Sequence, residues 1–358
     1  MGKIRVLVVD DSAFMRKIIS DLLSSDDRLE VIGTARNGKD GLEQISQLKP
    51  DVVTMDVEMP IMNGLDALKQ IMQKHPLPVV MLSSLTKQGA DMTIHAMSLG
   101  AVDFIAKPSG SISLDLDKVR DELVVKVVAA ASSRLSIREQ VKTAEVKVFA
   151  KAPEKNSADR NLVAIGTSTG GPRALQEVIG KLPSALAAPV VVVQHMPVGF
   201  TKSLAERLDS LSAIKVKEAE QNETLRNGVV YIAPGGHHLT IVQADSRLIA
   251  KLTLEDPVKG HRPSVDRMFE SISSLVNVDV CTVIMTGMGS DGTEGLKKMK
   301  TKLPSVYSIG ESAESCVVYG MPRAAAEAGL LHHVCTVQSI ASAIQQRINL
   351  LEGVNKWK

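Results

Sequence analysis

The sequence predicts an α/β protein with two doubly wound domains, and three features of the chain carry this prediction. Short apolar runs alternate with stretches whose apolar residues recur at helical spacing, at the start of the chain and again from Leu162 onward. Between these parts, residues 132–160 are rich in Ser, Lys, Arg, Glu and Ala and contain no sustained apolar face. We therefore expect α/β domains at residues 1–130 and 161–352, joined by a linker at residues 131–160.

The first domain is expected to contain a five-stranded parallel sheet. Its strands are predicted from apolar runs that end at Val9, Met55, Leu82 and Ala106, together with a weaker run at residues 31–34. Between these runs, apolar residues at helical spacing predict the covering helices. These residues are Phe14, Ile18, Ile19, Leu22, Leu23, Leu65, Leu68, Ile71 and Met72, and a last helix is expected from about Asp117 to Ala131.

The second domain is expected to be Rossmann-like, a doubly wound α/β sheet with a mixed edge. After the first apolar run at 162–165, its predicted strands are Val190–Val193, Gly228–Ile232, His238–Val242, Val280–Met285 and Ser305–Ser308. The segment 228–254 is more polar than the rest and resembles a hairpin. We therefore expect a mixed sheet and not a purely parallel one.

Composition excludes several classes of function. A formal net charge of +2 and an aromatic content of 3% give no basis for nucleic-acid binding. The three cysteines, Cys281, Cys316 and Cys335, are widely spaced and form neither a disulfide framework nor a metal-binding pattern. The N-terminus lacks the apolar segment of a signal peptide, and no apolar run approaches the roughly 18 residues of a membrane span. We expect a cytoplasmic protein that does not insert into membranes.

Polar residues are predicted at the carboxyl ends of the strands in the first domain. Asp10 and Asp11 follow the first strand, and Asp56 ends the third. Ser83 and Lys107 stand at the ends of two later strands. Because the carboxyl ends of parallel strands meet in one crevice, we expect these side chains to lie together. Clustered carboxylates repel one another unless a cation sits among them, and an all-oxygen set suits Mg²⁺. With a lysine and a hydroxyl, the cluster could cage a phosphoryl group on one carboxylate.

This pattern resembles response-regulator receiver domains. The resemblance covers residues 3–125 and is carried by Asp10-Asp11, the run Asp56–Gly64, Ser83 and Lys107-Pro108. It implies that Asp56 accepts a phosphoryl group from a phosphohistidine on a sensor kinase, with Asp10, Asp11 and Asp56 holding Mg²⁺. It also implies a switch role for Ser83 and Lys107.

A glycine-rich turn is predicted at Ser168, between a buried strand and a helix. The apolar run 162–165 comes before it, and Pro172 follows at a position that suits the first turn of a helix. The hydroxyl of Ser168 would then be exposed, and nearby backbone N–H groups would point at whatever binds there. Two kinds of site share this arrangement: a phosphate cradle and an activated serine nucleophile.

The other strand ends of the second domain favour the nucleophile. The glycines around the turn are Gly166, Gly170 and Gly171. Their spacing does not match Gly-x-Gly-x-x-Gly, and the Lys-Ser/Thr pair of a P-loop is missing. The next strand is followed by His195, where a nucleotide site would have a carboxylate. Asp291 lies in a glycine loop after another buried strand, so Ser168, His195 and Asp291 are expected to converge as a catalytic triad.

Taken together, the two domains resemble the chemotaxis protein-glutamate methylesterase (CheB) family, in which a receiver is joined to a C-terminal esterase. The motifs that carry this resemblance are Ile165–Gly171, Gln194–Thr201, Ala233–His237, Arg262–Asp266 and Met285–Gly292. The resemblance implies a serine esterase that hydrolyses glutamate γ-methyl esters on the cytoplasmic region of chemoreceptors. Some relatives also deamidate receptor glutamines, and no cofactor is implied for the esterase.

Roles for individual residues follow from this chemistry. Ser168 is expected to attack the ester carbonyl, with His195 as general base and Asp291 orienting His195. Backbone N–H groups of Thr169 and Met288 are expected to stabilise the oxyanion. We also expect the receiver to cover the esterase cleft until phosphorylation of Asp56 shifts the balance between two states.

Two other functions stay open at this point. The second domain could bind a partner or ligand without catalysing a reaction. It could also be a nucleotide-dependent enzyme that uses the Ser168 turn to hold phosphate, although the acidic ribose partner is missing. A DNA-binding regulator is disfavoured because the chain has neither a helix-turn-helix pattern nor a basic face.

Overall fold

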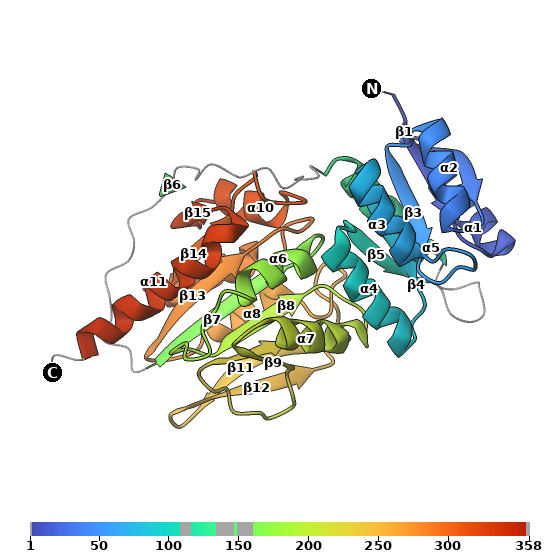
Figure 1. The fold of residues 1–358 in the computed structure, drawn as a ribbon. Coiled ribbons are helices and arrows are strands. Elements are labelled where there is room, and N and C mark those ends of the chain that lie inside the picture. Colours follow the sequence, from blue (N-terminus) through green and yellow to red (C-terminus); the bar gives the residue numbers. More distant parts are fainter. Residues whose placement is uncertain (1, 108–115, 134–146, 149–159, 356–358) are drawn as a thin grey trace. The chain divides into compact units, whose positions relative to one another are not determined.

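A computed structural model describes residues 2–107, 116–133, 147–148 and 160–355 of the chain (Figure 1). Its contacts divide the chain into two units, Met1–Glu139 and Gln140–Lys358, and each has a sheet of its own. The division falls within the expected linker at residues 131–160, most of which lies outside the described residues.

The N-terminal unit contains a five-stranded parallel sheet in the order β2-β1-β3-β4-β5. The strands are β1 Ile4–Val9, β2 Leu29–Ala35, β3 Val52–Asp56, β4 Val79–Ser83 and β5 Asp103–Ala106. The helices are α1 Ala13–Ser24, α2 Gly38–Leu48, α3 Gly64–Lys74, α4 Lys87–Leu99 and α5 Leu116–Ala131. The predicted doubly wound parallel sheet is confirmed, and each strand ends at the end of its apolar run or one residue later.

Local sequence explains where the first four helices begin. Ser12, Asn37, Asn63 and Thr86 each precede a helix and accept a hydrogen bond from a backbone N–H of its first turn. The central strands are buried on both faces, which matches their continuous apolar sequences. Strand order reverses between β1 and β3, so a crevice is expected at their carboxyl ends, where polar side chains can gather.

The C-terminal unit contains an eight-stranded sheet in the order β6-β15-β14-β13-β7-β8-β10-β9. Its strands are β6 Lys147–Val148, β7 Arg160–Thr167, β8 Val190–Gln194, β9 Lys215–Glu218, β10 Val229–Ile232, β13 Val278–Ile284, β14 Tyr307–Glu311 and β15 His333–Cys335. Within the described residues, all neighbours in this sheet are parallel except β6 and β15. The predicted Rossmann-like α/β fold with a mixed edge is therefore confirmed.

The hairpin in the polar middle of this unit does not join the main sheet. Strands β11 His238–Ala244 and β12 Arg247–Thr253 pair with each other as a separate antiparallel sheet. The hairpin packs through β11 against helix α8, Val265–Ile272. The expectation that this hairpin makes the sheet mixed was wrong, because β11 and β12 form a separate sheet whose apolar residues, such as Leu239 and Ile241, are buried where β11 packs against α8. The antiparallel edge comes instead from β6, inside the segment expected as a linker.

The helices of the C-terminal unit are α6 Gly171–Ile179, α7 Phe200–Leu211, α8, α9 Thr293–Lys302, α10 Met321–Glu327 and α11 Val337–Asn355. Among them, α8, α9 and α10 contribute side chains to a continuous apolar core that also contains side chains of the main sheet and of the hairpin. Helix α6 contacts α7 and α11, whereas α8 contacts α9.

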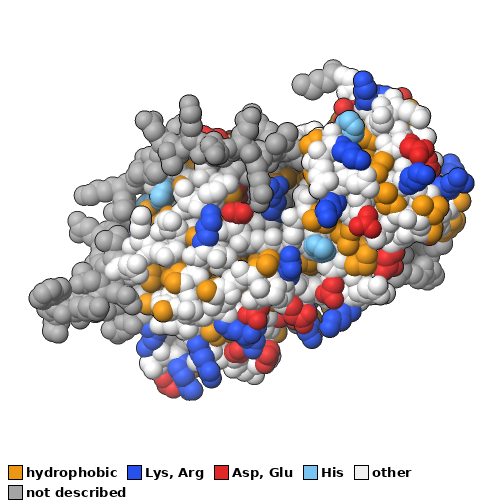
Figure 2. Space-filling view, in the orientation of Figure 1, with side chains coloured by type: hydrophobic (Ala, Val, Ile, Leu, Met, Phe, Trp, Pro, Cys, Tyr) orange, Lys and Arg blue, Asp and Glu red, His pale blue; other side chains and the backbone are white. Residues whose placement is uncertain are grey.

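On the face shown in Figure 2, positive and negative side chains are interspersed, as the small net charge suggests. Within the described part of the chain, no helix is both long and apolar enough to span a membrane.

Candidate active site

Three of the predicted residues lie at one edge of the main sheet in the C-terminal unit. Ser168 follows β7, His195 follows β8, and Asp291 lies in the loop after β13. These strands are adjacent and parallel, with β7 between β13 and β8, so their carboxyl ends share an edge. Parallel register pairs Thr167 with Gln194, one residue before Ser168 and His195 respectively. The sheet itself therefore brings the three positions to the same region.

Ser168 occupies a tight, hydrogen-bonded turn between β7 and α6. Its backbone N–H donates to the carbonyl of Thr286 (3.0 Å), and its carbonyl accepts from Gly171 N–H (2.7 Å) and from Gln194 Nε2 (3.0 Å). Gly170 has φ of 78°, a conformation that favours glycine. A Cβ on Gly171 would collide with the Gln194 side chain. A larger residue would thus be strained at position 170 and would clash at position 171. Ser168 itself is partly exposed.

His195 and Asp291 form a buried pair. The Nε2 atom of His195 lies 2.8 Å from Oδ2 of Asp291, with side chains 7% and 2% exposed. The backbone N–H of His195 donates to Thr167 O (3.2 Å), which fixes the start of its loop to β7. In the described part of the chain, the Ser168 hydroxyl forms no hydrogen bond with His195. The nitrogen that remains for such a bond is Nδ1, which is buried without a hydrogen-bond partner.

The carboxylate of Asp291 lies at the N-terminus of α8. It accepts hydrogen bonds from the backbone N–H groups of Val265 (2.7 Å) and Asp266 (3.0 Å) and from Ser264 Oγ (3.0 Å). Burial by itself raises the pKa of Asp291, but the bonds from His195, Asp266 and Val265 outweigh burial and hold this pKa well below its usual range. Asp291 is therefore a fixed anion, able to orient His195 and to stabilise an imidazolium ion.

Asp266, in the first turn of α8, binds the N-terminus of the next helix, α9, in the same way that Asp291 binds that of α8. Its Oδ1 accepts from the N–H groups of Gly292 (2.8 Å) and Gly295 (2.7 Å) at the start of α9, and its Oδ2 lies 2.9 Å from Lys259 Nζ. Asp291, in the loop before α9, thus accepts from N-terminal N–H groups of α8, and Asp266, in the first turn of α8, accepts from those of α9. Burial raises the pKa of Asp266, and its bonds to Gly295 and Lys259 oppose that effect. The reciprocal capping holds Asp291 in place from both sides.

A second histidine covers the first. The rings of His195 and His261 stack with centroids 3.8 Å apart and planes 10° from parallel. His261 ends a tight turn in which Val258 and His261 exchange backbone hydrogen bonds of 3.0 and 2.9 Å. Lys259 and Gly260 form the tip of this turn with positive φ. Because Lys259 also pairs with Asp266, the turn is attached to the helix pair that holds Asp291.

The two predicted oxyanion donors lie in segments that meet at Ser168. Thr169 is buried directly after Ser168. Met288 follows Gly287, whose hypothetical Cβ would lie 2.8 Å from Ser168 Cβ. Close approach of the two backbones is thus possible only because residue 287 is glycine. Whether Thr169 and Met288 donate to an oxyanion stays a prediction.

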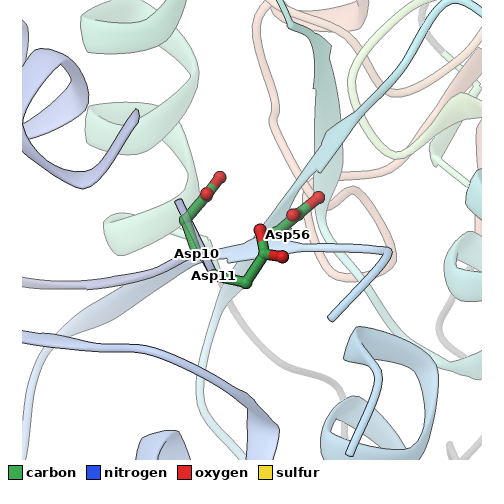
Figure 3. Close-up of side chains that lie close together, drawn as sticks. All are labelled: Asp10, Asp11 and Asp56. Atoms are coloured by element: carbon green, nitrogen blue, oxygen red, sulfur yellow. The ribbon is translucent and has the colours of Figure 1, made fainter. Parts of the chain in front are cut away.

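In the N-terminal unit, three carboxylates gather at the ends of β1 and β3 (Figure 3). One oxygen from each of Asp10, Asp11 and Asp56 lies within 4.8 Å of the others. Lys107 Nζ lies 2.8 Å from both Asp10 Oδ2 and Asp56 Oδ2. Burial raises the pKa of Asp56 to about 6, with Lys107 opposing the rise. The oxygen-only donor set fits Mg²⁺, because a divalent cation would offset the repulsion among three carboxylates.

Ser83 is the predicted residue that stays apart from this cluster. Its buried hydroxyl donates to the carbonyls of Gly89 (3.1 Å) and Ser84 (3.2 Å), rather than to a carboxylate. The sequence correctly put Ser83 at the end of β4 but could not show its rotamer. A switch role for Ser83 would require this side chain to exchange partners.

Sequence reasoning missed several residues at the edge of the main sheet that carries Ser168, His195 and Asp291. They are Ser264 and Asp266 at the start of α8, Lys259 and His261 in the turn, and Thr286 and Glu311 beside the Ser168 turn. The runs Arg262–Asp266 and Met285–Gly292 contain Ser264, Asp266 and Thr286, and they gave a signal as motifs without a role assigned to these three residues. Lys259, His261 and Glu311 contact Asp266, His195 and Thr286 respectively, and no helix or strand periodicity in the sequence reveals these contacts.

Comparison with known proteins gives matches over most of the chain. A family model described as CheB methylesterase matches residues 163–344, and one described as response regulator receiver domain matches residues 6–116. Relatives in Geobacillus kaustophilus and Bacillus subtilis are both named protein-glutamate methylesterase/protein-glutamine glutaminase. The first is 56% identical over 97% of this chain and 99% of its own length. The second is 54% identical over 95% of this chain and 97% of its own length.

A solved structure resembles the C-terminal unit. It is the catalytic domain of Thermotoga maritima CheB methylesterase, which is 43% identical in sequence with a TM-score of 0.51. The similarity covers 54% of this chain and 99% of that chain.

Proposed function

The chain belongs to the CheB methylesterase family, and from that premise we propose that it hydrolyses glutamate γ-methyl esters on chemoreceptors under the control of its receiver domain. The observation that supports this proposal most strongly is the 2.8 Å contact between His195 Nε2 and Asp291 Oδ2, at the sheet edge that carries Ser168. A buried imidazole with a fixed anionic partner is what a serine nucleophile needs from its base.

In the first half of the reaction, Ser168 Oγ attacks the ester carbonyl while His195 takes the hydroxyl proton. Asp291 holds the ring and stabilises the imidazolium that forms. The imidazolium then gives its proton to the departing methoxide oxygen, which leaves as methanol. The backbone N–H groups of Thr169 and Met288 are proposed to stabilise the tetrahedral oxyanion, and one such donor contributes about 3–4 kcal/mol.

In the second half, water attacks the glutamyl ester on Ser168. His195 takes a proton from that water and returns it to Ser168 Oγ, which releases the glutamate side chain and restores the enzyme. The same residues can act on a receptor glutamine, with ammonia replacing methanol as the leaving group. The relatives' name, protein-glutamine glutaminase, supports this second activity.

The receiver domain is proposed to regulate the esterase through Asp56. A sensor histidine kinase would be the phosphodonor, and Asp10, Asp11 and Asp56 would hold Mg²⁺. When bound, Mg²⁺ neutralises charge on the phosphoryl group during transfer. Lys107 lies within 2.8 Å of Asp56 Oδ2, so it can bind a phosphoryl oxygen on that carboxylate. We expect the unphosphorylated receiver to restrain the esterase and phosphorylation to relieve that restraint.

The test uses the purified full-length chain and membranes that contain chemoreceptors with labelled methyl esters. We expect release of labelled methanol, and a faster rate when Mg²⁺ and a small-molecule phosphodonor are added. Receptor binding without methanol release would favour a non-catalytic binding domain. Nucleotide-dependent turnover would favour a nucleotide enzyme.

A further inference from the structure

Glu311 is a buried acid that the proposed reaction does not use. It ends β14, the neighbour of β13, and is 1% exposed. Its Oε2 accepts a hydrogen bond from the backbone N–H of Thr286 (2.8 Å), and its Oε1 accepts one from Ser315 Oγ (2.9 Å). The carboxyl group thus bridges two segments that follow neighbouring strands. Among the described residues, no Lys, Arg or His pairs with it.

Thr286 connects Glu311 to the nucleophile turn. The carbonyl of Thr286 accepts from Ser168 N–H and from Thr167 Oγ1, both at 3.0 Å. Its Oγ1 donates to Thr169 O (2.9 Å) and accepts from Val318 N–H (3.0 Å). Thr286 therefore contacts the residues on both sides of Ser168 as well as Ser168 itself. Any shift of Thr286 must move the turn or break these bonds.

An acid buried at this position destabilises the folded state unless its hydrogen bonds offset the cost of burial. Burial raises the pKa of Glu311 to about 7, and the bonds from Thr286 and Ser315 offset only part of that. The titratable groups beside it are the thiols of Cys316 and Cys335, and burial raises the pKa of both. Neither thiol supplies a positive charge. An apolar side chain would avoid this penalty but would leave Thr286 N–H buried without a partner.

We propose that Glu311 is a positioning residue for the esterase reaction, which holds Thr286 and through it the Ser168 turn. This inference rests on the proposed function, because it assumes that Ser168 is the nucleophile. Glu311 lies behind the turn and is connected to it through the backbone of Thr286. Its effect comes from the length and hydrogen-bonding capacity of the side chain, and its charge is not required.

Two conservative variants distinguish an effect of side-chain length from an effect of side-chain charge. Glu311→Gln keeps the length: its Oε1 can accept from Thr286 N–H, and its Nε2 can donate to Ser315 Oγ. Glu311→Asp keeps the carboxyl group but is shorter by one methylene, so it cannot contact Thr286 and Ser315 together. A role that depends on position predicts that Gln is tolerated and Asp is not. A role that depends on ionisation predicts the reverse.

The experiment measures kcat and KM for methanol release from methylated receptor membranes, using full-length protein. It also measures the rate at which a fluorophosphonate probe labels Ser168. We expect Glu311→Asp to lower kcat and the labelling rate about tenfold to 100-fold, since small displacements of a reacting group have effects of this size. Glu311→Gln should stay within about threefold of wild type, and KM should change less than about twofold for both, because ground-state binding is untouched.

Asp279→Asn is the matched control. Asp279 is a buried acid near the start of β13, paired with Arg347 (2.8 Å), whereas Thr286 follows the opposite end of that strand. This variant should lower the unfolding temperature without lowering kcat. If Glu311→Asp cannot be purified folded, Ser315→Ala removes the second anchor of the carboxyl group, and we expect a loss of kcat of about threefold to tenfold.

Three results would overturn the proposal: wild-type kcat in Glu311→Asp, equal losses in the Gln and Asp variants, or a matching loss in Asp279→Asn. A wild-type protein that labels with the probe but releases no methanol refutes the proposed substrate, and the labelling rates then still test Glu311. Absence of both labelling and turnover in wild type contradicts the nucleophile and, with it, the role of Glu311.

Discussion

His195 contacts Asp291 through Nε2, at 2.8 Å from Oδ2, and this choice of nitrogen determines how the ring can act. With Nε2–H donating to the carboxylate, Nδ1 is the acceptor nitrogen of the neutral ring. The base would therefore take the Ser168 proton at Nδ1. Asp291 can keep this tautomer in place because the N-terminus of α8 keeps its carboxylate ionised.

Replacing Asp291 with Asn should disable the base without unfolding the protein. The Asn carbonyl can still accept from α8, but its amide would face Nε2 as a donor and drive the imidazole proton to Nδ1. We expect kcat for methanol release to fall about 10³-fold to 10⁴-fold, as for the equivalent change in other serine hydrolases. Asp245→Asn, at an exposed hairpin position, should keep wild-type kcat. A kcat for Asp291→Asn within about tenfold of wild type would contradict the assigned role.

The ring stack predicts a smaller effect at His261. His261→Ala removes the ring that covers His195 at 3.8 Å, so the base should sample more orientations. Stacked aromatic pairs contribute about 0.5–1.5 kcal/mol, which corresponds to a loss of kcat of about twofold to tenfold. His261→Phe keeps a flat ring and should recover most of the activity. Equal activity of the Ala variant and wild type, measured by methanol release, would show that the stack does not matter.

Burial of Glu311 predicts how stability depends on pH. Its pKa rises from the ordinary value of 4.5 to about 7 on folding, so the folded state binds the proton more tightly. The wild type should then lose stability as pH rises from 4.5 to about 7 and change no further from this group above that pH. Glu311→Gln does not titrate, so its stability relative to wild type should increase across this window by on the order of 3 kcal/mol.

Hydrogen exchange of the amides in β13 and β14, followed in urea at pH 5 and pH 8, localises this effect to the C-terminal unit. The same relative stability of the two proteins at both pH values would show that Glu311 does not titrate in this range.

Phosphorylation of the N-terminal unit should depend on Asp56. In Asp56→Asn, we expect neither incorporation of a phosphoryl group from a small-molecule phosphodonor nor faster methanol release on its addition. Removing divalent cations with EDTA should have the same effect on wild type, because Asp10, Asp11 and Asp56 repel without a cation. Asp21→Asn, at an exposed position on α1, is the control and should respond as wild type does. Stimulation that persists in Asp56→Asn would assign control to another site.

Most of the fold could be predicted from the sequence because parallel sheets bury both faces. The run Val190-Val191-Val192-Val193 has few alternatives to a buried strand, and β8 includes it. The packing of the β11–β12 hairpin was less predictable, since an alternating strand can pack on a sheet or on a helix. Its partner, α8, is determined only by tertiary packing. The short strand β6 gave no signal, because two residues form a strand only where an existing edge pairs with them.

The candidate site likewise contains residues that could be predicted from the sequence and residues that could not. The placement of Ser168, His195 and Asp291 at one end of the sheet could be predicted, because Ser168 and His195 directly follow strands, Asp291 lies in the loop after a strand, and each has a chemically distinctive side chain. Their supports were not, because the capping of Asp291 by α8 and the bond from Thr286 to Glu311 depend on how loops return to the sheet. Local sequence indicates which side chains reach the edge of the sheet. Long-range packing decides how firmly each one is held.

The role of Ser168 as nucleophile is tested most directly by methanol release in Ser168→Ala. Full-length wild type, Ser168→Ala and the neighbouring-loop control Ser290→Ala should be compared on methylated receptor membranes, with folding checked by thermal unfolding. We expect Ser168→Ala to lose at least about 10³-fold in kcat at an unchanged unfolding temperature, with Ser290→Ala close to wild type. Turnover by a folded Ser168→Ala protein at a rate near that of wild type would contradict the serine mechanism.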